Sequence, residues 1–336
     1  MIYALLHVCC FTVFNLALRL GQRRGSKLLV MVAFNYGIAL LATSLLFLRP
    51  QGGGPAFPAV AVGCGLTNGI LYFVHLLVIL AAYQIAGVGV TSALASSGAV
   101  VPAVVAWWIW DEHMTPGRLA ALGLVPLAMV LLRPAATKDR PLGLKADLIL
   151  LLTFAMAGVI GTIHRAAAEY LEPAQRPGYQ LLLFAAAAAG SCSYMAARGL
   201  RPEARELRLG AVVGVANALS LLFMLLGLGV LPAVVYFPLT TSLGIVSVVV
   251  GAALLWSERI TRRQLAGVSL ALLVVVLVNL PARSGAPDPT AKHNETLGFP
   301  QPRPPRDYSY IEFQLLDLCK FPGDDDQTHP RRGPPE

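Results

Sequence analysis

The sequence predicts an all-α polytopic membrane protein, with ten transmembrane helices in two inverted five-helix repeats and a disordered C-terminal tail. Three observations lead to this prediction. The 336 residues are 56% hydrophobic and 13% charged, with a mean hydropathy of +0.65, whereas a soluble domain carries about 25% charged residues. Apolar runs long enough to cross a bilayer follow one another along the chain. The first half of the chain also recurs in the second half.

Ten apolar runs are candidates for membrane-spanning helices, each of which needs about 20 mostly apolar residues. Helices are expected because lipid offers no partner for free backbone groups. The runs lie at 2–20, 28–48, 59–81, 87–109, 117–133, 147–167, 178–197, 209–230, 233–256 and 263–280. Very short breaks near 83–87 and 230–233 predict tight helical hairpins at equivalent places in the two halves.

A repeated Trp-x-Glu motif marks the duplication. Trp110 and Glu112 follow one apolar run, and Trp256 and Glu258 follow another, 146 residues later. Five predicted helices precede Lys138 and five follow it. Because five is odd, the second repeat must enter the membrane from the opposite side, which predicts an inverted repeat with a central cavity between the halves. The expected domains are 1–136, 137–280 and a Pro-rich disordered tail, 281–336.

The tail is the part of the chain that is not apolar. Within it, only 308–321 is expected to fold, as a short helix on a partner or a membrane surface. An unstructured tail without essential function is the favoured alternative.

The net charge of +8 does not indicate nucleic-acid binding, because the Lys and Arg residues lie in short loops between apolar runs. The expected partners are the lipid bilayer and a small-molecule solute, and a homodimer is left open. Loops on one side carry fifteen Lys and Arg, against four on the other side without the tail. The expected location is the cell membrane (plasma or inner), and the positive-inside rule predicts that both termini lie on its outer side.

The chain shows no pattern typical of a redox, metal or catalytic site. Its five cysteines form no CxxC pair, so neither a disulfide nor a zinc site is expected. No HExxH, G-x-S-x-G or Walker motif is present. We therefore expect no enzyme activity and no cofactor.

At the repeated motif, the chain resembles the drug/metabolite transporter superfamily, specifically permeases with two EamA-type domains. The second half fits closely, with Trp256, Glu258, Thr261, Gln264 and Gly267. The first half departs from the pattern at two positions, where Arg118 replaces Gln and Ala121 replaces Gly. The resemblance covers 1–280. It implies a ten-helix basket with a central substrate cavity, alternating access and cytoplasmic termini, in contrast to the charge count.

Neutral polar side chains are the candidate cavity residues, because charged side chains lie only near the ends of the predicted helices. This pattern disfavours a phosphorylated substrate and a proton-coupled antiporter that relies on a mid-membrane carboxylate. Polar residues that share one helix face or lie on neighbouring helices form the predicted substrate site: Asn68, Tyr72, His75, Asn217, Ser220, Asn15 and Tyr236. For Asn68 and Asn217, an interhelical hydrogen bond is the alternative to substrate contact.

Other polar residues have weaker functional interpretations. His75 is the best internal titrating group if protons are coupled, and His7 and His164 are weaker cavity candidates. Glu112 and Glu258 are expected to be structural, capping the following helix or pairing with a nearby Arg.

The function that these observations favour is a secondary transporter or facilitator for a small neutral or zwitterionic metabolite. An amino-acid-like metabolite fits this description, and export of the metabolite is implied by the resemblance alone. One alternative is an amphiphile or lipid flippase, or a membrane enzyme. A second alternative is a non-transporting structural or signalling membrane protein, for which the tail would matter most.

Overall fold

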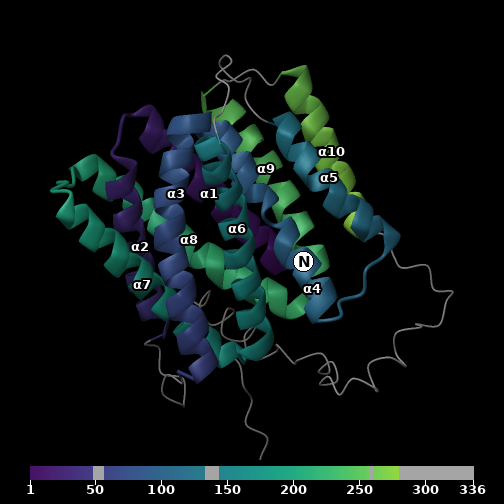
Figure 1. The fold of residues 1–336 in the computed structure, drawn as a ribbon, viewed down its shortest axis with the longest axis horizontal. Helices are drawn as coiled ribbons and strands as arrows, with labels where there is room; N and C mark the ends of the chain where they lie inside the picture. The colour runs from purple at the N-terminus through teal and green to yellow at the C-terminus, as the bar shows by residue number, and fades with distance from the viewer. Residues whose placement is uncertain (48–56, 133–143, 257–260, 280–336) are drawn as a thin grey trace, which may run out of the picture. The chain divides into compact units, whose positions relative to one another are not determined.

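The computed structural model describes residues 1–47, 57–132, 144–256 and 261–279, some of them by their backbone only. Within these ranges the chain is all-helical, as predicted, and Met1–Ser284 forms one compact unit (Figure 1). The helices are α1 Ile2–Arg23, α2 Leu28–Phe47, α3 Ala59–Ser97, α4 Val100–Ile109, α5 Pro116–Leu132, α6 Leu144–Tyr170, η1 Pro173–Gln175, α7 Arg176–Ala197, α8 Ala204–Val230, α9 Ala233–Trp256 and α10 Arg262–Asn279. The predicted tail, 281–336, lies outside the described residues.

The lengths and surfaces of these helices are those of a multi-pass integral membrane protein. Seven of the described helices are long and apolar enough to cross a membrane, and three shorter apolar helices lie at Ala95–Ile109, Pro116–Ala128 and Leu265–Leu277. Large apolar side chains point outward, including Trp108 at 82% exposure and Leu254 at 78%. Water would disfavour such a surface, whereas lipid solvates it.

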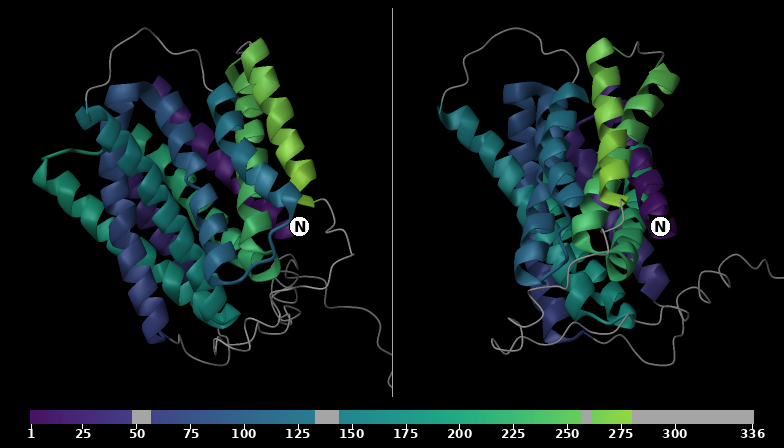
Figure 2. Two further views of the ribbon diagram at one scale, coloured as in Figure 1. Left: turned by 45° about the vertical axis from the view of Figure 1, so that its right-hand side comes forward. Right: turned by 90° about the vertical axis from the view of Figure 1, so that its right-hand side faces the viewer.

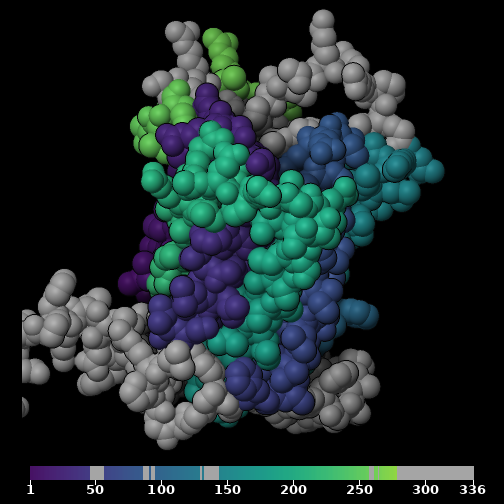
Figure 3. Space-filling model, turned by 90° about the vertical axis from the view of Figure 1, so that its left-hand side faces the viewer, coloured from purple at the N-terminus to yellow at the C-terminus, as the bar shows by residue number. Residues whose placement is uncertain are grey.

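Helices from the two halves of the chain pack against each other throughout this unit. Helix α1 packs on α8 and α9, α2 on α7 and α8, α3 on α6 and α7, α4 on α6 and α9, and α5 on α10. Figure 3 shows purple and blue segments of the first half lying beside green segments of the second half on one face. The core of the unit is therefore built by both halves together.

Helix α3 is not interrupted at 83–87, where a break was predicted, although the chain does reverse direction in this region as the predicted hairpin implies. The predicted break at 230–233 is present. Helix α3 continues from Ala59 to Ser97, and the interruption comes at Gly98 and Ala99. The second break is present because Leu231 leaves the helical region, with φ −111° and ψ 138°, as is favoured for a residue that precedes proline. No proline lies between 83 and 87, so the backbone there stays helical and keeps its hydrogen bonds inside lipid.

Helix α3 is too long to cross a bilayer as a straight rod. Its 39 residues would extend roughly 58 Å at 1.5 Å per residue, about twice the hydrocarbon thickness. Its first part runs antiparallel to α6: the Tyr72 hydroxyl lies 2.9 Å from His164 Nε2, whereas His75 lies near the backbone of Thr153, earlier in α6.

The end of α3 and the start of α4 run the other way along α6. A Cβ on Gly98 would meet Ala157, and a Cβ on Gly161 would meet Pro102, so this segment is parallel to α6. The chain therefore reverses direction between His75 and Gly98, and the ribbon bends over at one end of the bundle (Figure 2, left).

Glycines allow the closest helix contacts between the halves. A Cβ at Gly65 on α3 would lie 2.9 Å from Leu182 Cβ and 3.0 Å from the Tyr179 carbonyl oxygen on α7. Small residues at such crossings let helix backbones approach and gain dispersion energy, which is the main packing force in lipid.

Candidate functional site

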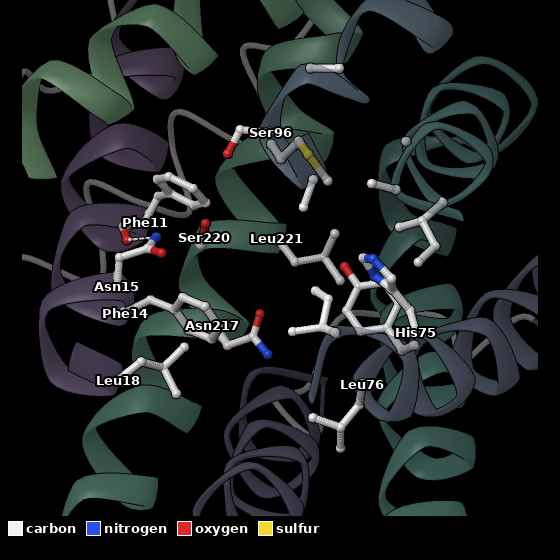
Figure 4. A pocket seen from close by; sticks show the side chains of 18 of the residues that line it. Phe11, Phe14, Asn15, Leu18, His75, Leu76, Ser96, Asn217, Ser220 and Leu221 are labelled. Atoms are coloured by element: carbon white, nitrogen blue, oxygen red, sulfur yellow. Dashed lines mark hydrogen bonds between the residues drawn. The ribbon is translucent and has the colours of Figure 1, made fainter. Parts of the chain in front are cut away.

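A cavity of ≈ 400 Å³ lies between the two halves of the unit (Figure 4). Its described lining comes from α1, α2, α3 and α4 of the first half and from α6, α8 and α9 of the second half. In Figure 4, the amide of Asn217 points into the space between α1 and the α3 residues His75 and Leu76. The volume falls in the range of small-molecule pockets, about 300–1,000 Å³.

The lining combines apolar walls with uncharged polar groups. Among the described lining residues, none is Asp, Glu, Lys or Arg. The polar groups are hydroxyls, amides and imidazoles: His7, Asn15, Gln22, Tyr36, Tyr72, Tyr83, His75, Ser96, His164, Asn217, Ser220, Thr240 and Thr241. Such a cavity solvates a neutral solute without the cost of burying an unpaired charge.

One wall of the cavity is tied to a hydrogen-bonded chain between α3, α6 and α7. The Tyr72 hydroxyl lies 2.9 Å from His164 Nε2, and the Tyr179 hydroxyl lies 2.7 Å from His164 Nδ1. Asn68 Nδ2 donates to the Tyr179 hydroxyl at 2.7 Å. Both nitrogens of a 2% exposed imidazole are thus held by tyrosines, which fixes the orientation of the ring.

A second polar pair lies between α1 and α8. His7 Nδ1 is 2.8 Å from the Ser220 carbonyl oxygen and 3.1 Å from its hydroxyl. The His7 ring also stacks against Phe11, with the centroids 6.0 Å apart. The histidine is therefore held by a carbonyl from the other half of the chain, and its ring borders the cavity.

The amide of Asn217 joins α8 to α2 while its side chain borders the cavity. Asn217 Nδ2 donates to Asn35 Oδ1 at 3.2 Å. On α1, Asn15 Nδ2 donates to the Phe11 carbonyl at 2.8 Å, the bond dashed in Figure 4. Asn217 and Asn15 therefore each keep the amide oxygen and one amide hydrogen that these bonds do not use.

The cavity brings together five of the seven predicted substrate residues. Asn15, Tyr72, His75, Asn217 and Ser220 line it.

The other two predicted residues, Asn68 and Tyr236, lie outside the described lining and are 0% exposed. Asn68 makes the interhelical hydrogen bond that was the alternative for it. The hydroxyl of Tyr236 is buried without a hydrogen-bond partner among the described residues. Both side chains are buried in the helix packing, which the sequence could not show because lipid-facing and core-facing positions are similarly apolar.

Two lining residues, His7 and His164, were only weak candidates from the sequence. The partner of His164 on α3 lies 92 residues away, and the partner of His7 on α8 lies 213 residues away. The available signal was that both are rare polar groups within apolar helices, where such residues need a partner.

Beyond the cavity, at the end where α4 and α6 finish and α9 begins, a buried ion pair joins these helices. Arg165 Nε donates to Glu112 Oε1 at 2.9 Å, and the side chains are 8% and 7% exposed. The other oxygen of Glu112 accepts the Val234 N–H at 2.8 Å, at the first turn of α9. The predicted Arg pairing is confirmed, but Glu112 caps α9 and not the helix that follows it, because the loop turns its carboxylate inward.

The tryptophans of the repeated motif both lie against arginines. The Arg165 guanidinium is 5.2 Å from the centroid of the Trp110 ring, and those of Arg19 and Arg23 are each 5.3 Å from that of Trp256. These are cation–π contacts. Glu258 lies outside the described residues.

The described residues also contain no group of three His, Cys, Asp or Glu side chains arranged to hold a metal ion.

Comparison with known proteins places the fold. No protein-family model matches the chain, and no curated protein matches it. Among solved structures, 28 chains match. One of them, described as "Crystal structure of protein", has a TM-score of 0.66 and 14% sequence identity over 83% of this chain and 99% of that chain. The chain thus shares its fold with a protein of known structure.

Proposed function

We propose that this chain is a secondary transporter or facilitator that moves a small neutral or zwitterionic metabolite by alternating access. The observation that carries the proposal is the uncharged cavity of ≈ 400 Å³ between halves of an apolar helical unit. Polar groups are costly in a membrane interior and usually face a solute pathway or another helix. In this cavity, groups from seven helices border one space.

We also propose that the unit consists of ten spans in two inverted repeats, as in permeases with two EamA-type domains. The contacts of two glycines support this duplication. A Cβ placed on Gly214 of α8 would lie 2.7 Å from the Asn35 carbonyl oxygen and 2.7 Å from Ile38 Cβ on α2. Gly65 makes the same contacts with residues of α7 that lie 144 positions after Asn35 and Ile38.

The tryptophan contacts support the same relation. Trp256 lies 146 residues after Trp110, and Arg165 lies 146 residues after Arg19. Trp110 follows α4 and contacts Arg165 of α6, and Trp256 ends α9 and contacts Arg19 of α1. These two contacts are equivalent if α1 corresponds to α6 and α4 corresponds to α9. In the same way, the packing of α1 and α2 on α8 in one direction corresponds to the packing of α6 and α7 on α3 in the other.

The position of the cavity supports a state that is open toward one side. The cavity extends to Gln22, Leu28 and Tyr83, at the end where the α1–α2 connection carries Arg24 and Lys27. The buried Glu112 pair joins helices at the opposite end. In this proposal the ion pair closes that end and separates when the cavity opens the other way.

The proposal is tested by solute flux in proteoliposomes loaded with a mixture of uncharged and zwitterionic metabolites. The full chain should move at least one solute faster than empty liposomes do, and Asn217→Ala should slow that flux. Asn68→Ala should act mainly through stability, since Asn68 does not line the cavity. If the folded parent moves none of the solutes, the proposed function is wrong.

A further inference from the structure

The hydrogen bonds around His164 have a defined direction, which one backbone carbonyl determines. Asn68 Nδ2 lies 3.5 Å from the Ile160 carbonyl oxygen and 2.7 Å from the Tyr179 hydroxyl. A carbonyl oxygen can only accept, so the nitrogen of the amide must face it and must donate. The opposite orientation would place two oxygens against each other.

The direction passes from Asn68 to Tyr72 through two shared hydrogen bonds. Because the Tyr179 oxygen accepts from Asn68, its own hydrogen is free for His164 Nδ1, 2.7 Å away. A neutral imidazole that accepts at Nδ1 carries its hydrogen on Nε2. That hydrogen points to the Tyr72 oxygen at 2.9 Å. The neutral form is favoured because His164 is buried without a carboxylate among its described partners.

Tyr72 is left as a hydrogen-bond donor. Its oxygen accepts from His164, so its own hydrogen must go to another acceptor. Among the described residues no such acceptor is found for this hydroxyl, and Tyr72 lines the cavity. The hydroxyl hydrogen of Tyr72 is therefore available to a molecule in the cavity.

His7, on the opposite pair of helices, has the reverse polarity. Its Nδ1 lies 2.8 Å from the Ser220 carbonyl oxygen, so Nδ1 must carry the hydrogen. In the neutral ring, Nε2 then holds a lone pair. His7 Nε2 makes no hydrogen bond among the described residues, and it is not among their fully buried unpaired atoms. Because His7 lines the cavity, this lone pair is accessible from it.

We infer that the cavity binds a solute that carries two uncharged hydrogen-bonding groups. One is an acceptor, such as a carbonyl oxygen, which binds the Tyr72 hydroxyl, and the other is an N–H or O–H donor, which binds His7 Nε2. The inference rests on the proposed function and narrows its substrate class. A solute with acceptors only would leave Nε2 of His7 without its partner, and a buried unpaired group weakens binding. Tyr72 and His7 are thus specificity-determining residues for amide-like or hydroxy-carbonyl solutes.

The first test reads the two imidazoles directly, without a substrate. The full chain, labelled with ¹⁵N-histidine and placed in lipid nanodiscs, gives ¹⁵N resonances that distinguish protonated from unprotonated ring nitrogens. His7→Gln and His164→Gln assign the signals by their loss. We expect hydrogen on Nε2 of His164 and on Nδ1 of His7. Hydrogen on the other nitrogen of either ring, or on both nitrogens near neutral pH, overturns the inference.

The second test uses flux and a pair of matched variants. Tyr72→Phe and Tyr236→Phe each remove one tyrosine hydroxyl, but only Tyr72 borders the cavity. For each solute that the parent moves, Tyr72→Phe should raise the half-saturating concentration about five- to tenfold, the effect of one lost hydrogen bond. Tyr236→Phe should leave it unchanged.

The solutes themselves provide the remaining comparison. A transported solute should lose flux when its N–H or O–H groups are methylated, because the acceptor on His7 then has no donor. Equal flux of a solute and its methylated form, or equal effects of the two phenylalanine variants, would overturn the assignment. A parent that moves no solute would refute the proposed function, while the ¹⁵N result would still decide the polarity.

Discussion

Removing the carboxylate of Glu112 should destabilise the protein much more than removing its exposed neighbour in the same ion cluster. Glu112 is 7% exposed and accepts two hydrogen bonds, from Arg165 at 2.9 Å and from the Val234 N–H at 2.8 Å. The variant Glu112→Ala leaves a buried guanidinium and an uncapped N–H at the first turn of α9. Breaking a buried pair by removing one partner costs about 3–5 kcal/mol.

The expected value lies near the lower limit of this range, because Arg165 keeps two other contacts. Glu169 Oε2 remains 2.9 Å from the guanidinium, and the Trp110 ring centroid remains 5.2 Å from it. We therefore expect Glu112→Ala to lower the free energy of unfolding by about 3 kcal/mol. Glu169→Ala is the matched control, since its side chain is 34% exposed and an ion pair that water can reach contributes about 1 kcal/mol or less.

The assay is reversible unfolding in mixed micelles, titrated with a denaturing detergent and followed by tryptophan fluorescence and circular dichroism. A double-mutant cycle of Glu112→Ala with Arg165→Ala isolates the pair from the separate loss of the helix cap. The argument fails if Glu112→Ala costs no more than Glu169→Ala, or if the cycle shows no coupling between Glu112 and Arg165.

Three further variants test the packing. Gly65→Ala should cost about 1–3 kcal/mol in the same unfolding assay, because its Cβ would meet α7 backbone at 3.0 Å. Gly63→Ala, on the same helix with nothing within 4 Å, should be neutral or stabilising, and equal costs would contradict the close crossing. Tyr236→Phe removes a buried hydroxyl without a described partner, so unfolding should require as much detergent or more. A clear loss of stability would show that this hydroxyl is hydrogen-bonded.

Much of the fold could be predicted from the sequence because lipid restricts the choice. An apolar run must become a helix in a membrane, so the ends of most helices were found to within a few residues. The short break before Ala233 was visible because Pro232 interrupts the helix. No interruption is found at 83–87, because short polar and glycine residues do not by themselves end a helix whose backbone must stay hydrogen-bonded. The chain nevertheless reverses direction between His75 and Gly98, as the predicted hairpin implies.

The candidate site could be predicted only in part. Polar residues within apolar helices stand out in the sequence, and two of those predicted to bind substrate, Tyr72 and Asn217, line the cavity. The sequence does not predict which face of each helix points toward the cavity, because lipid-facing and core-facing positions are equally apolar. This is why Tyr236 and Asn68 were assigned to a cavity that they do not line.

The central claim is that the cavity is the path of a transported solute, and blocking it chemically after folding tests that claim most directly. A variant without the five native cysteines would carry Asn217→Cys, whose side chain would point into the cavity. The protein is reconstituted, treated with a bulky uncharged maleimide and checked by mass for complete labelling. The cysteine-free parent receives the same treatment. We expect flux of the transported solute to fall to that of empty liposomes only in the labelled Asn217→Cys protein. Unchanged flux through the fully labelled protein would contradict the account.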